Sequence, residues 1–384
     1  MVPEGWTVVE AKEICESISV GVVIKPSQYY VDESVGIKSF RSANVREGFI
    51  NDSDWVYFSQ EGHLANKKSQ LKSGDVLIVR TGYPGTACVV TPEFEGANAI
   101  DIVIARPQKD KVLPEYLCAY TNSSVGKSQV LSLQGGMAQK HLNVSAYQTL
   151  KVKLPPLSEQ MKISQILSAW DKAITTTEQL LANSQQQKKA LMQQLLTSKR
   201  RFPKFNEDWI EVYLGDIAKI TTGSSNRQDS QLSGKYTFFD RSEDIRSSDR
   251  YLFDGEAVIV PGEGQDFVPK YFFGKFDLHQ RTYAIMDFPT CDGKYLFYAI
   301  HYFRAHFLSQ AVGSTVKSLR LPMFQKMKLH LPVLAEQKKI ASILSDADQE
   351  IELLQQKLSH LKQEKKALMQ QLLTGKRRVQ TEAA

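Results

Sequence analysis

The sequence predicts an α/β (α+β) protein in which two β-sheet heads alternate with two long helices. The first observation is a repeat: residues 154–201 occur again, without a gap, as residues 331–378, and more than half of the aligned positions are identical. The second is that residues 1–153 and 202–330 carry short β-rich runs and turn signals in the same order. A duplicated segment of this length indicates a duplicated structural role. We therefore expect a pseudo-twofold arrangement.

Each copy of the repeat has the pattern of a long amphipathic helix. In the second copy, apolar residues follow alternating steps of four and three from Ile340 to Leu372, and only Lys365 interrupts the series. This 3.5-residue period is typical of a left-handed coiled coil. The first copy repeats the pattern but has Thr177, Ser184 and Lys188 in its middle, so we expect weaker packing there. Because such helices are marginal alone in water, each copy is expected to pack on the other.

The ends of the repeat fix the predicted boundaries. Ser158 and Ala335 are expected as N-caps, since they follow prolines that exclude helix, and Gly375 is expected to close the second helix. The predicted segments are head 1 (residues 1–154), a central helix (155–203), head 2 (204–331) and a C-terminal helix (332–384).

The two heads contain matching predicted elements. In head 1 we expect strands at residues 6–9, 75–80 and 100–105, and helices at 11–17 and 115–130. In head 2 we expect strands at residues 209–213 and 257–260, and helices at 214–220 and 295–307. Landmarks agree in pairs, such as Tyr116 with Tyr295 and Lys140 with Lys317. The heads are thus predicted to share one fold and to differ in surface.

Composition describes a globular protein without a membrane or secretory segment. The 384 residues carry a formal net charge of +6, but the surplus falls on the two repeats, whereas the heads are balanced. Bulk charge therefore does not identify the heads as nucleic-acid binders, and any such binding must come from local patches. No apolar run approaches the ~18 residues of a membrane span. Four cysteines without C-x-x-C spacing indicate reduced thiols in the cytoplasm.

The repeat also carries a family resemblance. Its L-P-x-L-x-E-Q entry, long helix and K-K-A-L-M-Q-Q-L-L-T exit occur once mid-chain and once near the C-terminus, each after a variable head. This order resembles the specificity subunit of type I restriction-modification enzymes. The resemblance covers essentially the whole chain. The polar middle of the first helix departs from it and puts the tightness of packing there in question.

The resemblance implies a division of labour. The heads would be target-recognition domains, each reading one half of a bipartite double-stranded DNA site. The helices would form an antiparallel coiled coil that sets the spacer and binds two methyltransferase subunits. Motor-nuclease subunits would join that complex. S-adenosylmethionine, ATP and magnesium would belong to these partners, and no cofactor to this chain. The residues that read bases do not carry over, because recognition domains differ with their target.

Candidate DNA-binding residues come from polar loops that follow buried strands and from basic clusters. Arginine can bind guanine through two hydrogen bonds, glutamine can bind adenine, and glycine lets backbone amides approach phosphate. The alternatives are plain connecting turns and, since Arg241 and Arg246 are interleaved with acids, a solvated mixed-charge surface. The candidates are Arg41, Arg46, Lys67, Lys68, Arg80, Thr81, Gly82, Tyr83, Gln139, Lys140, His141, Arg227, Arg241, Arg246, Gln265, Lys317 and Arg320.

The helices present an apolar face wider than a two-helix seam requires. We expect another protein to dock on this extra width. The residues assigned to partner binding are Ile163, Leu167, Leu191, Met192, Leu195, Leu196, Ile340, Leu344, Leu368, Met369, Leu372 and Leu373. The basic helix exits, which include Arg201 and Arg378, admit either a phosphate contact or complementarity to the helix C-terminus.

Motifs for catalysis and metal binding are weak. Gly126-Lys127-Ser128 imitates the end of a P-loop, but Thr121 occupies the position of its first glycine. His301 and His306 lie on an aromatic helix, where packing is the simpler role. We therefore predict no catalytic residue and no metal site. Three alternatives stay open: a self-contained methyltransferase or nuclease, a coiled-coil scaffold whose heads bind proteins, and a modification system without the motor subunit.

Overall fold

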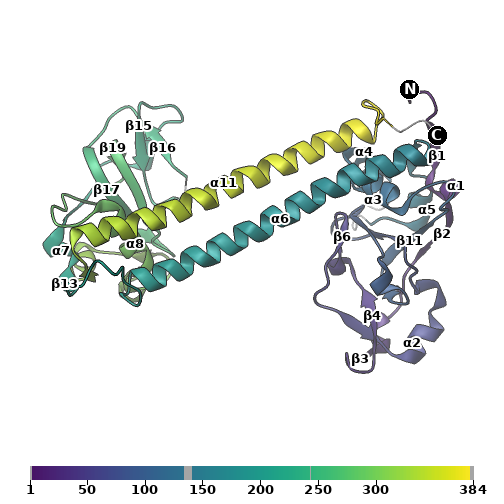
Figure 1. Ribbon diagram of the computed structural model, residues 1–384, viewed down its shortest axis with the longest axis horizontal. Coiled ribbons are helices and arrows are strands. Elements are labelled where there is room, and N and C mark those ends of the chain that lie inside the picture. Colours follow the sequence, from purple (N-terminus) through teal and green to yellow (C-terminus); the bar gives the residue numbers. More distant parts are fainter. Residues whose placement is uncertain (1, 134–140, 243, 381–384) are drawn as a thin grey trace. The chain divides into compact units, whose positions relative to one another are not determined.

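The computed structural model describes residues 2–133, 141–242 and 244–380, and the chain divides into two compact units (Figure 1). Unit 1 comprises Met1–Thr177 and Lys357–Ala384, and unit 2 comprises Glu178–Gln356. The long helices α6 (Leu157–Leu195) and α11 (Leu334–Leu372) each contribute one part to either unit. Each unit therefore consists of one head together with part of both helices. The order head, helix, head, helix holds along the chain. The boundaries between the two compact units, however, lie inside the long helices.

Head 1 contains short strands in two four-stranded sheets and two ladders. The sheet in its centre has the order β2 (Cys15–Val20), β11 (Ile102–Pro107), β8 (Val76–Val79), β9 (Ala87–Val89). The other has the order β10 (Asn98–Ala99), β4 (Ile37–Phe40), β7 (Val56–Phe58), β3 (Tyr30–Val31). The ladders join β1 (Thr7–Glu10) to β12 (Lys151–Leu154) and β5 (Val45–Arg46) to β6 (Phe49–Ile50). The helices are α1 (Ala11–Ile14), α2 (Gln60–Ala65), α3 (Pro114–Asn122), α4 (Ser124–Ser132) and α5 (Val144–Gln148).

Head 2 is built around one larger sheet. Its order is β14 (Lys219–Thr222), β20 (Thr282–Met286), β17 (Phe253–Pro261), β19 (Lys270–Leu278), β15 (Tyr236–Phe239), β16 (Arg246–Ser248). Ladders join β13 (Ile210–Tyr213) to β22 (Lys328–Leu331) and β18 (Glu263–Gly264) to β21 (Lys317–Ser318). The helices are α7 (Leu214–Ile217), α8 (Gly293–Tyr302), α9 (Ala305–Gln310) and α10 (Leu321–Gln325).

The central strand of each head is buried on both faces. In β8, Val76 and Ile78 belong to one apolar cluster while Leu77 and Val79 belong to another. The middle of β17 alternates between two clusters in the same way. Successive side chains of a strand point to opposite faces, so a strand covered on both sides must be apolar throughout. This explains the uninterrupted apolar runs from which both strands were predicted.

In each unit the start of one long helix packs near the end of the other. Ile163 of α6 shares an apolar cluster with Leu372 of α11 in unit 1, and Leu195 of α6 shares one with Leu344 of α11 in unit 2. The two helices therefore run antiparallel within each unit. The prediction of two long, mutually packed helices is confirmed.

Two of the three polar residues predicted in the middle of the first helix, Ser184 and Lys188, have partners across the seam, whereas Thr177 donates to the Ala173 carbonyl of its own helix. Lys188 pairs with Asp348 in unit 2, and Lys365 pairs with Asp171 in unit 1. Ser184 donates a hydrogen bond to Glu350, with 3.2 Å between Oγ and Oε1. Polar groups at buried seam positions must be paired because an unpaired one loses its hydration without compensation. The middle of the first helix is thus a polar seam with named partners, which apolar periodicity alone could not show.

Matching contacts anchor each helix start to the end of the other helix. Arg378 binds Glu159 in unit 1, and Arg201 binds Glu336 in unit 2 with 2.7 Å between Nη2 and Oε2. These arginines therefore serve as helix-end contacts, which makes phosphate binding the weaker interpretation for them. Gly375 has a φ of 75°, the left-handed conformation expected of a residue that ends a helix.

Several predicted helix boundaries are wrong, and the helices predicted at 11–17 and 214–220 already end at Ile14 and Ile217. The long helices begin at Leu157 and Leu334, each one residue before the predicted caps Ser158 and Ala335. The helix predicted at 115–130 is interrupted at Ser123, which is extended (ψ 160°) and caps α4 by accepting from the Gly126 amide. The helix predicted at 295–307 is likewise divided into α8 and α9. At Ser123 a capping side chain decides where the helix starts, which apolar periodicity does not show.

Candidate nucleic-acid interface

In both heads, two loops that are distant in sequence meet beside the central strand. In head 1, Arg80 and Leu142 exchange hydrogen bonds: the Leu142 amide donates to the Arg80 carbonyl at 3.0 Å, and Arg80 Nε donates back at 2.9 Å. In head 2, the Leu319 amide donates to the Gly262 carbonyl at 2.8 Å, and β18 pairs with β21. The structure thus joins the two marked loops of head 2, and in head 1 it joins Arg80 to Leu142, which follows the marked residues 135–141.

The loop that follows β8 has an exposed tip, and the arginine at its start, Arg80, is mostly buried. Thr81, Gly82 and Tyr83 are exposed, and Tyr83 is 84% exposed. The Arg80 side chain is only 12% exposed and is held by Asp101 and the Leu142 carbonyl. The Arg80 guanidinium therefore fixes the loop beneath this exposed tip.

The other candidates in head 1 lie on separate elements. Arg41 donates to the Asp54 carbonyl at 2.6 Å, and Arg46 donates to the Val45 carbonyl at 3.1 Å. Lys67 and Lys68 are exposed in a short 3₁₀ turn, and His141 is half-buried next to Leu142. Gln139 and Lys140 lie outside the described residues. Within the described part of head 1, no hydrogen bond or ion pair joins Arg41, Arg46 or the two lysines to the loop at Thr81.

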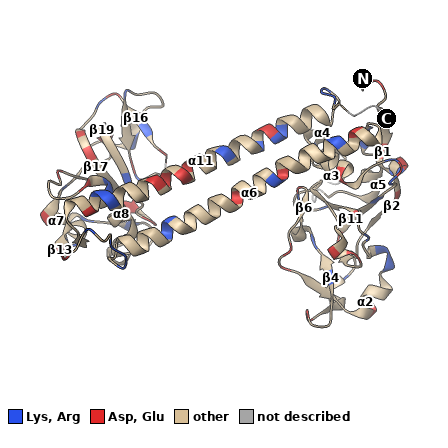
Figure 2. Cartoon of the chain, viewed as in Figure 1, with Lys and Arg blue, Asp and Glu red and all other residues tan. Residues whose placement is uncertain are grey.

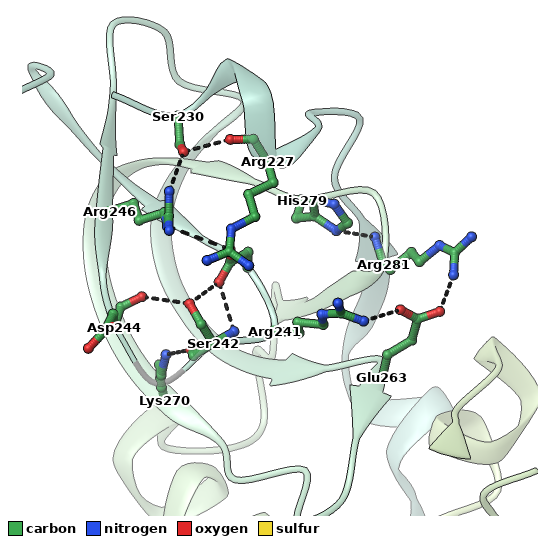
Figure 3. A network of polar contacts seen from close by, with 11 residues as sticks. Arg227, Ser230, Arg241, Ser242, Asp244, Arg246, Glu263, Lys270, His279 and Arg281 are labelled. Carbon is green, nitrogen blue, oxygen red and sulfur yellow. Dashed lines mark hydrogen bonds and ion pairs between the residues drawn. The ribbon is translucent and has the colours of Figure 1, made fainter. Parts of the chain in front are cut away.

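Head 2 gathers four arginines around two carboxylates (Figure 3). Arg227 and Arg246 flank Asp240, with their Nε atoms 3.8 and 3.9 Å from its Oδ2. Arg241 and Arg281 converge on Glu263, and Arg241 Nη1 lies 3.2 Å from its Oε2. Beside them lies a hollow of about 300 Å³, lined by Arg227, Asp240, Arg241, Glu263, His279, Gln280 and Arg281.

The carboxylates are buried and the arginines point outward. Asp240 is 3% exposed and the Glu263 side chain 12%, whereas the side chains of Arg227, Arg241 and Arg281 are all more than half exposed. A buried carboxylate restricts the guanidinium that it binds and so orients its outward donors. Arg227 and Arg246 thus lie beside the buried Asp240, and Arg241 beside Glu263, in a surface where cations and carboxylates are paired.

Electrostatics keep this arrangement charged. Burial by itself raises the pKa of the Asp240 carboxyl, but hydrogen bonds from Ser242 and the charges of Arg227 and Arg246 hold it below its ordinary value. Burial lowers the pKa of His279. Its Nδ1 accepts from the Arg281 amide at 3.1 Å, which places the ring proton of the neutral form on Nε2. The hollow therefore offers cationic donors and one neutral imidazole.

The remaining candidates of head 2 lie on the exposed side of the paired loops. Gln265, Lys317 and Arg320 are exposed, and Lys317 stands opposite Gly264 in the β18–β21 ladder. Sequence reasoning missed Arg281 and His279 as parts of the site, whereas Glu263 belongs to a loop, residues 261–265, that the sequence marked. Arg281 lies in the turn between β19 and β20 without a neighbouring basic residue, so only its contact with Glu263 reveals it.

Most residues of the wide apolar helix face pack against other parts of the same chain. Of the twelve residues assigned to partner binding, Leu191, Leu368 and Met369 are half-buried. The other nine are buried in the apolar clusters of units 1 and 2: Ile163, Leu167, Met192, Leu195, Leu196, Ile340, Leu344, Leu372 and Leu373. Most of the expected docking face is therefore packed inside the chain, while Leu368 and Leu372 also line an open groove of about 1530 Å³ in unit 1.

Charges of both signs are spread over the heads and along α6 and α11 (Figure 2). In the described ranges no group of three or more His, Cys, Asp or Glu side chains is placed to hold a metal ion. Across the same ranges, none of the helices combines the length and apolarity needed to cross a membrane.

Comparison with known families assigns these features. Residues 3–183 and 206–363 match the model of the type I restriction modification DNA specificity domain, once for each head and its following helix. The chain belongs to this family. It is the DNA specificity subunit of a type I restriction-modification system, with heads 1 and 2 as its target-recognition domains, and such subunits are not themselves catalytic.

Relatives extend over the whole specificity subunit. The chain is 26% identical over 414 residues to a putative type I restriction enzyme MjaX specificity subunit of Methanocaldococcus jannaschii, covering 99% of this chain and 95% of that protein. It is 29% identical over 171 residues to the EcoDI specificity subunit of Escherichia coli, covering 44% of this chain and 38% of the relative.

A solved structure shows the same fold. The type I restriction-modification S subunit from M. genitalium matches with a TM-score of 0.67 at 12% identity, covering 97% of this chain and 96% of that one. The combination of two β-sheet heads and two long packed helices is therefore confirmed.

Proposed function

We propose that each head of this specificity subunit reads one half of a bipartite DNA site. The observation that carries the proposal is a shared frame with different outward residues. The Leu142–Arg80 contact of head 1 and the Leu319–Gly262 contact of head 2 occupy matching places, yet the tips differ: Thr81 and Tyr83 in one head, Gln265 in the other. Equivalent frames with unlike tips suit the reading of two unlike half-sites.

In head 2 we assign DNA contact to the arginine hollow and the paired loops. Arg227, Arg241 and Arg246 present oriented guanidinium groups, which bind guanine edges and phosphates. Gln265, Lys317 and Arg320 flank them, and Arg281 is added by the structure. In head 1 the corresponding surface comprises Thr81, Gly82 and Tyr83 with His141. Arg41, Arg46, Lys67 and Lys68 are assigned to phosphate contacts around it.

The helices are proposed to set the spacer and to bind partner subunits. Both are 39 residues long, which makes their length the natural measure of the distance between half-sites. Two methyltransferase subunits that carry S-adenosylmethionine, and motor-nuclease subunits that use ATP and magnesium, would assemble on this subunit. Since the apolar seam is internal, docking would use exposed helix surface such as the groove of about 1530 Å³ in unit 1, whose lining includes Met161, Ile166 and Trp170.

We place this activity in the cytoplasm, where the DNA and the partner subunits are found. The four cysteines, Cys15, Cys88, Cys118 and Cys291, are buried free thiols, and such thiols persist in a reducing compartment.

A domain exchange tests the proposal. Residues 204–331 are replaced by the second head of another family member, and the modified DNA sites are determined in cells that hold the partner subunits. We expect one half of the recognised sequence to change while the other half is retained. The reciprocal exchange of residues 1–154 is the matched control and should change the opposite half. A change in both halves after either exchange would contradict independent heads.

A further inference from the structure

Unit 1 contains a pocket that nothing in DNA reading requires. Its volume is about 530 Å³, within the range of ~300–1,000 Å³ typical of small-molecule sites. Strands β6 and β9 and helix α3 contribute its walls, and α6 and α11 contribute Ser164, Asp171 and Lys365. The pocket thus lies between head 1 and the helix parts of the same unit.

Unit 2 shows what fills the matching space there. Tyr116 of α3 donates to the Lys153 carbonyl, and Tyr295 of α8 donates to the His330 carbonyl, so the two helices correspond. With this correspondence Ala119 matches Tyr298. Since the repeats align without a gap, the Asp171–Lys365 pair matches the Asp348–Lys188 pair.

The side chain of Tyr298 makes two contacts in unit 2, and these indicate which chemical groups a ligand in the unit 1 pocket would need. Its hydroxyl donates to Asp348 Oδ2 at 2.6 Å, and Lys188 Nζ lies 5.6 Å from its ring centroid. In unit 1 the small Ala119 lines the pocket together with Asp171 and Lys365. The space that a phenol ring occupies in unit 2 is therefore open in unit 1, with the corresponding acceptor and cation in place.

The rest of the pocket selects for positive charge. Its lining includes Glu47, Asp52, Glu93 and Glu115, and among the described residues that line it Lys365 is the one base. Glu47 and Asp52 bind Lys127 and Lys38, so Glu93 and Glu115 carry most of the attraction for a cation. Phe49, Phe94 and Met369 add apolar surface for a ring. Two buried hydroxyls, Thr91 Oγ1 and Ser164 Oγ, have no hydrogen-bond partner within the described chain and line the same pocket.

We propose that this pocket binds a small hydroxyaromatic cation, with its ring beside Ala119, its hydroxyl donating to Asp171 and its ammonium group near Glu93 and Glu115. The inference rests on the open space and on its filled counterpart, and it is independent of which DNA bases the heads read.

Calorimetric titration of the full chain with tyramine tests the proposal. We expect saturable binding, and roughly tenfold weaker binding of phenethylamine, which lacks the hydroxyl that donates to a charged acceptor. Ala119→Tyr should abolish tyramine binding by placing the ring of the counterpart in the pocket. Asp171→Asn keeps the shape and should weaken binding. Asp348→Asn is the matched control in unit 2 and should leave binding unchanged.

Each result decides the question. Absence of saturable binding to the unaltered chain overturns the proposal, as does undiminished binding to a folded Ala119→Tyr variant. If Ala119→Tyr does not fold, the comparison of Asp171→Asn with Asp348→Asn decides by itself. An equal effect of these two substitutions places the ligand elsewhere and overturns the assignment.

Discussion

Single buried carboxylates determine how head 2 presents its arginines. Glu263 accepts hydrogen bonds from Arg241 and Arg281, whereas Asp240 has Arg227 and Arg246 beside it at 3.8 and 3.9 Å, as ion pairs that are longer than a hydrogen bond. A pre-oriented guanidinium loses less freedom when it binds a base edge or a phosphate, so part of the entropic cost of recognition is met during folding. Glu263 thereby makes Arg281, isolated in sequence, part of the candidate interface.

Replacing Arg281 tests this interface. Arg281→Ala should weaken binding of the head 2 half-site by about 1–3 kcal/mol if the guanidinium reads a base, with relaxed specificity at one position. Binding would be measured by titration of DNA duplexes that vary one base pair at a time. Lys328→Ala, an exposed base that pairs with Glu211 elsewhere in head 2, is the control. Unchanged affinity for every duplex would exclude Arg281 from the interface.

The Asp240 carboxyl predicts a pH dependence. Its pKa is lowered in the folded chain from an ordinary value of 3.8, so its stabilising contribution is present above that value and is lost as the pH falls below it. Asp240→Asn should therefore be less stable than the unaltered chain at pH 7, and the difference should shrink below about pH 4. Urea unfolding at several pH values measures this, and a difference independent of pH would argue against an ionised Asp240.

At the scale of elements, the long helices combine an apolar seam at their ends with ion pairs in the middle. Lys188 with Asp348 and Lys365 with Asp171 occupy matching places in the two units. Charged pairs at seam positions favour one register, because a shifted register leaves each charge without its partner. The polar middle of the helices thus buries less apolar surface, but it fixes the register in which α6 and α11 pack.

A charge exchange tests the alignment. Lys365→Glu and Asp171→Lys should each destabilise unit 1, and the double variant should recover part of the loss. We expect a coupling of about 0.5–1 kcal/mol, since solvent screens the half-exposed Asp171. Thermal unfolding of the single and double variants measures it, and Lys366→Glu, on the exposed neighbouring position, serves as control. Strictly additive effects would show that the pair contributes nothing to register.

At the scale of the whole molecule, the chain repeats one plan twice. Each head packs on the start of one long helix and the end of the other, and the same pairs recur: Glu159 with Arg378, and Glu336 with Arg201. The units differ in how their strands are divided into sheets, in their outward loops and at single positions such as Ala119 and Tyr298. A common frame with variable surfaces allows a new half-site to be read without a new fold.

Insertion of one heptad into each long helix tests the spacer. Seven residues preserve the seam and add about 10 Å of helix. The recognised spacer should lengthen by up to about three base pairs, at ~3.4 Å each, while both half-sites stay the same. Sequencing of modified sites measures the spacer. A retained spacer in an assembled complex would mean that helix length does not set it.

The sequence by itself determined the long helices, the order of heads and helices, the central strands and the family resemblance. Each of these depends on short-range periodicity or on a direct repeat, and both are legible without knowing what packs where. It also marked Arg227, Arg241, Gln265 and Lys317 in loops that the structure brings together.

Tertiary structure alone decided which charges face outward and which spaces stay open. Arg80 is tied down by Asp101, Arg281 is recruited by Glu263, and most of the apolar helix face is covered by the heads. Ala119 leaves a pocket open in unit 1, whereas Tyr298 fills the matching space in unit 2. The physical reason is common to all four: burial and pairing depend on residues far away in the chain, so a side chain's type shows what it can bind but not whether folding has already satisfied it.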